Sequence, residues 1–139
     1  SKVICCDTFL LTGTVSQKQY HEKLVSNGTF YQFINNATKH GFLEEVIPLA
    51  TLSYLSVPLI RGPMRLVFID GTHDRNNCHK DVEVCFPLIA PGGILAIHDA
   101  HGGGWPDLEH YVKTELIKRD NLEPLETVGT IMAFKKISE

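Results

Sequence analysis

The stretch RLVFIDGTH at residues 65–73 decides the fold, because a continuous apolar run stands directly before an acid and a glycine. Continuous rather than alternating apolarity indicates a strand buried on both faces, as in a parallel sheet. Residues 87–99, PLIAPGGILAIHD, repeat this pattern: a Pro-Gly-Gly turn leads into a second buried strand, which ends at His98 and Asp99. The two stretches predict neighbouring parallel strands with polar side chains at their carboxyl ends.

Outside these two strands, short apolar runs alternate with amphipathic stretches. We expect further strands at 3–6, 46–50 and within 126–137, helices at 31–40, 75–89 and 107–118, and a polar loop at 12–29. Alternating strands and helices imply βαβ units. The sequence therefore predicts an α/β fold with a Rossmann-like, mostly parallel sheet, helices on both faces, and a single domain over residues 1–139.

Composition sets limits on partners and compartment. The net charge of −3 gives no electrostatic reason to expect nucleic acid, and no apolar run is long enough to cross a bilayer. No signal-peptide pattern opens the chain, so we expect a cytoplasmic location. The four cysteines, Cys5, Cys6, Cys78 and Cys85, form no Cys-x-x-Cys pair and are interpreted as small buried thiols.

Ligands of open α/β sheets bind beyond the carboxyl ends of the strands. Asp7, Asp70, His98 and Asp99 all stand at that end of a predicted strand. Asp70 and Asp99 end strands that should be neighbours, so their carboxylates should converge. Two close carboxylates repel each other unless a proton or a cation lies between them, and Mg²⁺ is the most natural cation for oxygen ligands.

These stretches resemble a known family. Residues 68–73 and 87–99 resemble the fourth strand, the following helix and the fifth strand of class I S-adenosylmethionine-dependent methyltransferases. The Ile-Asp-Gly-x-His pattern with a terminal His-Asp is similar to the small-molecule and sugar O-methyltransferase branch, which contains macrocin-type and mycinamicin-type enzymes, and to cephalosporin-hydroxylase-like proteins. Residues 3–9 and 46–53 resemble the family's second and third strands. The resemblance implies that the first strand and its Gly-x-Gly loop would precede residue 1. We therefore expect residues 1–139 alone to bind S-adenosylmethionine weakly or not at all, and a chain extended upstream to bind it.

The resemblance also implies roles in cofactor binding. Asp7 would bind the ribose hydroxyls of S-adenosylmethionine, Ser53 would lie on the adenine side, and Asp70 would contribute to the cofactor site. Leu52 departs from the pattern, since the family often has an acid there.

In metal-dependent members of the branch the cation ligands lie at the positions of Asp70, His98 and Asp99. His98 replaces an acid that is usual there, which makes the predicted site softer. The position of His73 is that of the general base that takes the proton from the acceptor hydroxyl. We therefore expect O-methylation of a small-molecule hydroxyl, with a sugar as the favoured acceptor and a divalent cation, Mg²⁺ first, assisting.

Each site residue has a plainer interpretation. Asp7 could bond to its own loop, Asp70 and Asp99 could cap the helices that follow, and His73 could be a surface residue at a helix start. The triple glycine at 102–104 is interpreted as a mobile active-site loop, and Trp105 either closes over substrate or packs.

Three other functions stay open. His73, His98, Asp99 and His101 could build a metal-dependent hydrolase, although no positioned nucleophile partner is visible. The chain could also be a catalytically inactive methyltransferase-fold fragment or a self-associating scaffold. If the central first strand is missing, strands 3–6 and 65–69 have unpaired edges, so we expect them to pair with each other or to form a homo-oligomer.

Overall fold

The computed structural model describes residues 2–7 and 29–138. The chain divides into two compact units, residues 1–56 and 57–139. The expectation of one domain over residues 1–139 stays a prediction. The predicted polar loop lies, up to residue 28, outside the described residues.

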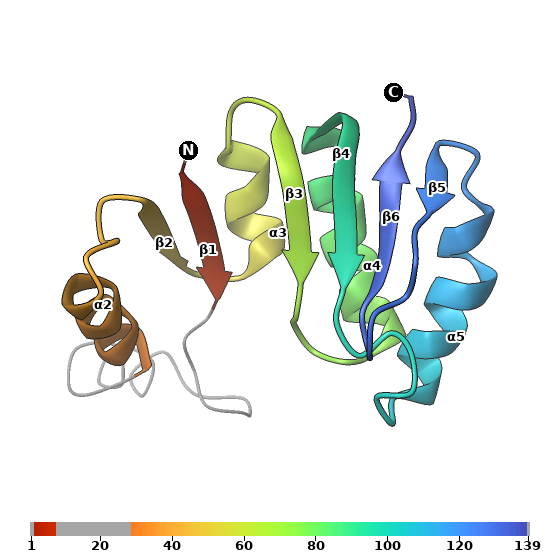
Figure 1. The fold of residues 1–139 in the computed structure, drawn as a ribbon, viewed down its shortest axis with the longest axis horizontal. Coiled ribbons are helices and arrows are strands. Elements are labelled where there is room, and N and C mark those ends of the chain that lie inside the picture. The colour runs from red at the N-terminus through yellow and green to blue at the C-terminus, as the bar shows by residue number, and fades with distance from the viewer. Residues whose placement is uncertain (1, 8–28, 139) are drawn as a thin grey trace. The chain divides into compact units, whose positions relative to one another are not determined.

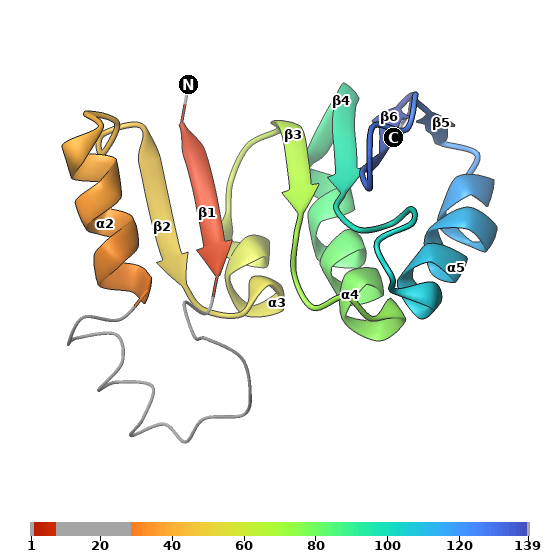
Figure 2. The ribbon, with the colours of Figure 1, turned by 60° about the horizontal axis from the view of Figure 1, so that its bottom comes forward.

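In the first unit a two-stranded parallel sheet pairs β1 with β2, and α2 lies next to β2 (Figures 1 and 2). The bounds are β1 Val3–Asp7, α2 Thr29–Lys39, β2 Val46–Ala50 and α3 Ser53–Ser56. Gly41 follows α2 with a φ of 74°, a left-handed conformation that glycine adopts without steric cost. The two strands and the helix predicted here are therefore confirmed.

The second unit holds a four-stranded sheet in the order β3-β4-β6-β5. Strands β3 and β4 are parallel, whereas β6 runs antiparallel to both β4 and β5. The bounds are η1 Val57–Leu59, β3 Met64–Ile69, α4 Arg75–Cys85, η2 Phe86–Leu88, β4 Ile89–Ile97, α5 Pro106–Thr114, η3 Leu116–Lys118, β5 Leu122–Pro124 and β6 Met132–Lys136. The predicted α/β, Rossmann-like class is confirmed.

One hydrophobic core lies between this sheet and helices α4 and α5, which cover the same face (Figure 2). Its largest fully buried side chains come from strands and helices alike: Val82, Ile89, Leu95, Ile97, Leu108, Tyr111, Val112, Leu116 and Phe134. Burying one such side chain stabilises the fold by about 1.5–3 kcal/mol. Cys78 and Cys85 share the inner side of α4 and are both buried, as their spacing predicted.

Two boundaries differ from the sequence prediction. The predicted helix at 75–89 ends as an α-helix at Cys85, because Pro87 lacks the amide hydrogen that continues a helix. The predicted Pro-Gly-Gly turn lies inside β4: Met64 pairs with Ile89 but Leu66 pairs with Ile94, so the intervening residues bulge from the ladder. Strand β5 was not predicted, since three residues that include a proline give no strand pattern.

Candidate active site

The carboxyl ends of β3 and β4 bring Asp70 and His98 together. Ile69 pairs with Ile97, and the amide of His98 donates a hydrogen bond of 3.0 Å to the carbonyl oxygen of Ile69. This register places the residue after each strand at the same edge of the sheet. Asp70 Oδ1 consequently lies 3.0 Å from Nδ1 of His98.

His73 reaches the same point from the start of α4. Asp74 is the N-cap of this helix and accepts hydrogen bonds from Asn77 N (3.0 Å) and Asn77 Nδ2 (2.7 Å). The cap fixes the turn so that His73, the preceding residue, lies with Nε2 3.7 Å from Asp70 Oδ1 and 3.3 Å from Asp99 Oδ2. His73 is thus not a plain surface residue.

The backbone of Asp99 explains how its carboxylate faces His73. Asp99 is the one non-glycine residue with a positive φ, 54°, among the described residues. Such a conformation costs an L-residue about 1–2 kcal/mol, and Asp tolerates it better than most. Gly103 packs so closely on this side chain that an added Cβ would lie 2.8 Å from Asp99 Cβ and 2.9 Å from Oδ1.

Neither aspartate occupies an N-cap position. Helix α4 is capped by Asp74, and the N-cap of α5 is Trp105. The interpretation of Asp70 and Asp99 as helix caps is therefore wrong, because other residues cap both helices.

Two imidazole nitrogens of this cluster have no hydrogen-bond partner. His73 Nε2 and His98 Nδ1 are buried atoms, and neither makes a hydrogen bond even though carboxylate oxygens lie 3.0–3.7 Å away. One ligating atom from each of Asp70, His73 and His98 falls within 4.8 Å of the others. Since an unpaired buried polar atom is costly, this arrangement fits a bound cation or a transferred proton.

Two contacts hold the glycine loop between β4 and α5, one with His73 and one with Glu109. Trp105 stacks on His73 with ring centroids 4.8 Å apart and planes 15° apart, so its ring packs against the candidate base. Gly102 N donates to Glu109 Oε2 (3.2 Å), and the Lys113 ammonium, together with this amide, lowers the pKa of Glu109.

His101 belongs to a different arrangement. Its Nδ1 lies 3.4 Å from Glu109 Oε1, and its amide donates to the carbonyl oxygen of Thr130. The candidate metal group among the described residues contains Asp70, His73 and His98 and leaves out His101, which weakens the hydrolase alternative.

In the first unit, Asp7 and Ser53 lie at the carboxyl edge of the β1–β2 sheet. Asp7 pairs with Ala50 at the ends of the two strands, and Ser53 begins α3 three residues after Ala50. A contact of 3.1 Å between Cys6 Sγ and Ser56 Oγ ties α3 to β1. The Asp7 side chain is exposed, and the predicted roles of Asp7 and Ser53 in binding a ribose and an adenine stay predictions.

Sequence reasoning missed Asp74 and Glu109, and it placed Gly103 in an active-site loop without its contact with Asp99. An Asp directly before a helical stretch is an N-cap signal that could have identified Asp74. The roles of Gly103 and Glu109 carry no such signal, because they depend on contacts with Asp99 and Gly102 that only the folded loop creates.

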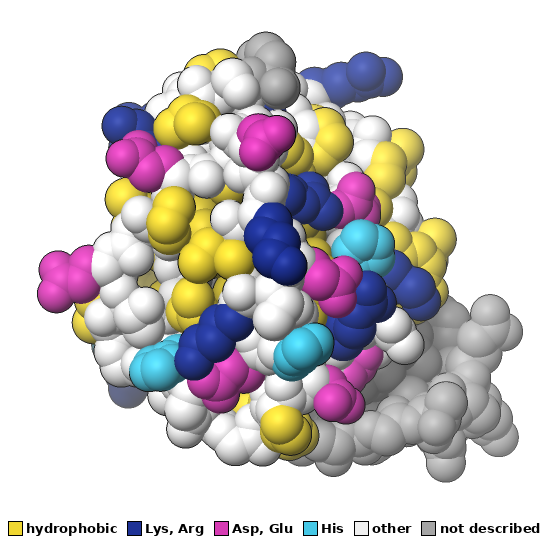
Figure 3. Space-filling view, turned by 90° about the vertical axis from the view of Figure 1, so that its right-hand side faces the viewer, with side chains coloured by type: hydrophobic (Ala, Val, Ile, Leu, Met, Phe, Trp, Pro, Cys, Tyr) yellow, Lys and Arg dark blue, Asp and Glu magenta, His cyan; other side chains and the backbone are white. Residues whose placement is uncertain are grey.

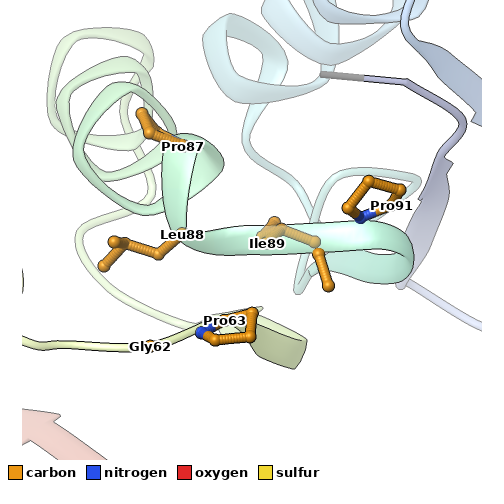
Figure 4. A pocket seen from close by; sticks show the side chains of 7 residues that line it. Gly62, Pro63, Pro87, Leu88, Ile89 and Pro91 are labelled. Atoms are coloured by element: carbon orange, nitrogen blue, oxygen red, sulfur yellow. The ribbon is translucent and has the colours of Figure 1, made fainter.

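A pocket of about 340 Å³ lies at the opposite, amino ends of the same strands (Figure 4). Its lining is apolar and rich in proline: Gly62, Pro63, Pro87, Leu88, Ile89, Ala90 and Pro91. No titratable side chain lines it, so the pocket offers no acid, base or metal ligand.

The surface around α5 mixes both signs of charge (Figure 3). Arg75 pairs with Glu115, whose carboxylate lies 2.6 Å from the Arg75 guanidinium, and further pairs join Lys113 to Glu109 and Arg119 to Glu83. The expectation of no nucleic-acid partner is not tested by this pattern and stays a prediction. No helix in the described part of the chain has the length and apolar character that crossing a membrane requires.

Several solved structures share this fold. An SAH-bound methyltransferase of Podospora anserina, PaMTH1, aligns with 99% of this chain and 62% of its own at a TM-score of 0.72 and 12% identity. An rRNA methylase of Streptococcus thermophilus aligns with 99% of this chain and 74% of its own at a TM-score of 0.59 and 16% identity. MycE, a methyltransferase from the mycinamycin biosynthetic pathway in complex with Mg and SAH, aligns with 68% of this chain and 33% of its own at a TM-score of 0.54 and 16% identity.

At these identities the likeness shows the fold alone, and this chain spans only part of the length of each of these proteins. No curated protein sequence matches this chain. A family model described as a methyltransferase domain matches residues 1–100. Because that match spans 100 of 139 residues, the chain belongs to the methyltransferase-domain family.

Proposed function

We propose that the protein transfers the methyl group of S-adenosylmethionine to a hydroxyl of a small molecule, with a sugar as the favoured acceptor. The observation that carries this proposal is the meeting of His73 with two carboxylates at the carboxyl ends of β3 and β4. Membership of the family supports methyl transfer. MycE, whose structure holds both Mg and SAH, supports the pairing of a cation with the cofactor in a protein of this fold.

His73 would take the acceptor proton. The acceptor oxygen forms a bond to the methyl carbon while the carbon–sulfur bond breaks. The electron pair of the broken bond stays on sulfur, which gives S-adenosylhomocysteine. The proton leaves the hydroxyl for the imidazole, which then carries a positive charge. Asp99 at 3.3 Å and Asp70 at 3.7 Å would stabilise this imidazolium, which is the usual role of a carboxylate next to a catalytic histidine.

The cofactor would contact three predicted residues. A carboxylate accepts hydrogen bonds from two ribose hydroxyls, which suits the exposed Asp7, and Ser53 at the start of α3 would face the adenine. Asp70, whose side chain is half exposed, is the third residue with a predicted cofactor role. The enzyme's main contribution to an in-line displacement is positioning.

The donor set at the cluster fits a divalent cation, and Mg²⁺ fits it only in part. Asp70 and Asp99 offer the oxygen ligands that Mg²⁺ prefers, whereas His98 offers nitrogen. When bound next to the acceptor, a cation would lower the pKa of its hydroxyl. Asp70, His98 and Asp99 would hold such an ion, which leaves His73 free to take the proton.

The test combines cofactor binding with transfer. Isothermal titration of a chain extended upstream by the expected first strand and Gly-x-Gly loop should show S-adenosylmethionine binding that Asp7→Asn weakens about 10–100-fold, since a hydrogen bond to a charged group is worth about 1.5–3 kcal/mol. Glu44→Gln, which changes another exposed acid of the same unit, should leave the affinity unchanged. Radiolabelled methyl groups should then appear on hydroxyl compounds, sugars first. Equal affinities for both variants and the wild type, or no transfer to any hydroxyl, would contradict the proposal.

A second candidate is a non-catalytic, self-associating module. It is favoured by β3, an edge strand of its sheet that exposes Leu66 (61%) and Phe68 (51%) on one face. Exposed apolar side chains on an edge strand invite pairing with another chain. Light scattering on the titration sample separates the two candidates: a stable oligomer without cofactor binding supports the module, and a cofactor-binding monomer rejects it.

A further inference from the structure

The cluster around Asp70 has nitrogen as well as oxygen donors. One carboxylate oxygen and two imidazole nitrogens, from Asp70, His73 and His98, lie within 4.8 Å of one another. Imidazole suits borderline transition-metal ions, whereas Mg²⁺ requires oxygen ligands in octahedral geometry. The two nitrogen donors therefore favour a borderline transition-metal ion, whereas the carboxylates alone would favour Mg²⁺.

Two of the separations between these donors lie near those of a small tetrahedral site. Zinc–ligand distances of about 2.0–2.1 Å separate two ligands of a tetrahedron by about 3.4 Å. Asp70 Oδ1 lies 3.0 Å from His98 Nδ1 and 3.7 Å from His73 Nε2, on either side of that value. The same Asp70 oxygen faces both nitrogens, so small rotations of the side chains would bring all three to one ion.

The two nitrogens are also unsatisfied as hydrogen-bonding groups. His73 Nε2 and His98 Nδ1 are buried without a hydrogen bond. A buried polar atom left unpaired costs about 1–3 kcal/mol, and an ion at this point would satisfy both atoms at once. Asp99, with oxygens 3.3 Å from His73 Nε2 and 3.6 Å from His98 Nδ1, or a water molecule would fill the fourth position.

We propose that Asp70, His73 and His98 bind a borderline divalent transition-metal ion, for which Zn²⁺ is the probe, in preference to Mg²⁺. A second consequence rests on the proposed function: the ion occupies the buried nitrogen of His73 and thereby prevents this residue from taking the acceptor proton. Borderline ions would then inhibit methyl transfer, whereas an ion held by Asp70, His98 and Asp99 would not.

Metal titration of the whole chain, without cofactor or acceptor, tests the site. One Zn²⁺ should bind per chain, at least about 100-fold more tightly than Mg²⁺. His73→Ala and His98→Ala should each lower the affinity for Zn²⁺ by more than about 10–100-fold. A change to a residue that only supports a metal ligand already costs that much, and these variants remove a ligand itself. The matched control is His110→Ala, which removes an exposed histidine of α5 outside the cluster and should leave Zn²⁺ binding unchanged.

A spectroscopic measurement guards against variants that simply misfold. Co²⁺ bound in place of Zn²⁺ should give the intense visible bands of a four-coordinate site, and His98→Asn should abolish them while circular dichroism stays that of the wild type. Zn²⁺ affinity that survives both histidine variants but falls in Cys5→Ser would place the ion elsewhere and overturn the proposal. Equal or tighter binding of Mg²⁺ would do the same.

Inhibition is measured separately, so that the two proposals fail in different ways. If no methyl transfer occurs with any metal but Zn²⁺ binds as described, the proposed function fails and the metal site stands. If transfer occurs and saturating Zn²⁺ leaves its rate unchanged, the metal site stands, but the claim that the ion blocks His73 is wrong.

Discussion

The two ends of strands β3 and β4 are built from opposite chemistry. At the carboxyl ends, Asp70, His73, His98 and Asp99 converge, and two imidazole nitrogens are buried without hydrogen bonds. At the amino ends, prolines and aliphatic residues line an apolar pocket. The same pair of strands therefore carries unsatisfied polar groups at one end, whereas apolar residues line the pocket at the other end.

Glycines show this difference most directly. An added Cβ on Gly93 would meet Ile89 Cγ2 at 2.7 Å and the carbonyl oxygen of Ala90 at 2.8 Å, so this glycine permits the bulge of β4. An added Cβ on Gly103 would instead meet the side chain of Asp99. Gly93 allows the strands to pack closely, and Gly103 leaves room for the carboxylate of Asp99. Close approach of the backbone permits the strand bulge at one end and fixes the position of Asp99 at the other.

The largest effect should follow from His73→Ala at the carboxyl ends. We expect kcat to fall by about 10²–10⁴, the usual loss for a missing general base, while the affinity for S-adenosylmethionine stays unchanged. Steady-state kinetics with an acceptor found in the transfer assay measures this, with added imidazole to restore part of the rate. His110→Ala provides the control, and full turnover by His73→Ala would show that the histidine is not the base.

The two glycines give a matched pair of variants. Gly93→Ala and Gly103→Ala should each lower the free energy of unfolding by about 1–3 kcal/mol through overpacking. Only Gly103→Ala should also impair the site, by up to about 10²-fold in kcat, because it displaces Asp99. Chemical denaturation and kinetics on both variants check this. If Gly93→Ala impaired turnover of the folded protein as strongly, the contrast between the two ends would be wrong.

The smallest effect concerns the cap that positions His73. Asp74→Ala should lower the free energy of unfolding by about 0.5–2 kcal/mol at neutral pH. Hydrogen bonds from Asn77 lower the pKa of Asp74 in the folded protein. Its stabilisation is therefore complete above the unfolded pKa of about 3.9 and is lost as the pH falls through the lower, folded value.

Denaturation of the wild type and of Asp74→Ala at pH 7 and at pH 3 measures this effect. The difference between the two proteins should shrink at the lower pH. A difference that stays constant or grows on acidification would mean that the carboxylate of Asp74 does not stabilise the helix start.

Most of the fold could be predicted from local pattern. The apolar run before Asp70 and the one before His98 identified β3 and β4, and the helical spacing of Leu108, Tyr111 and Val112 identified the buried side of α5. The positions of these elements could be predicted because periodicity follows directly from the order of residue types. The expected burial of the 65–69 strand on both faces is wrong, because β3 is an edge strand whose Leu66 and Phe68 side chains are 61% and 51% exposed.

The bulge of β4 and the short strand β5 could not be predicted from the local sequence pattern. Pro91-Gly92-Gly93 has the sequence of a turn, yet the pairing of Met64 with Ile89 and of Leu66 with Ile94 makes it part of a strand. Strand β5 exists because β6 runs antiparallel beside it and supplies its hydrogen-bond partners. Pairing between segments distant in sequence decides such elements.

The sequence by itself determined which residues end the strands, and hence that Asp70, His98 and Asp99 stand at the edge where α/β sheets bind ligands. Only the tertiary structure decided that His73 Nε2 and His98 Nδ1 face the same Asp70 oxygen. It also decided that Asp74 rather than Asp70 caps α4 and that Gly103 packs on Asp99. The physical reason is that residue type and spacing fix which groups reach an edge, whereas distances between side chains depend on strand register, backbone φ and the packing of a loop.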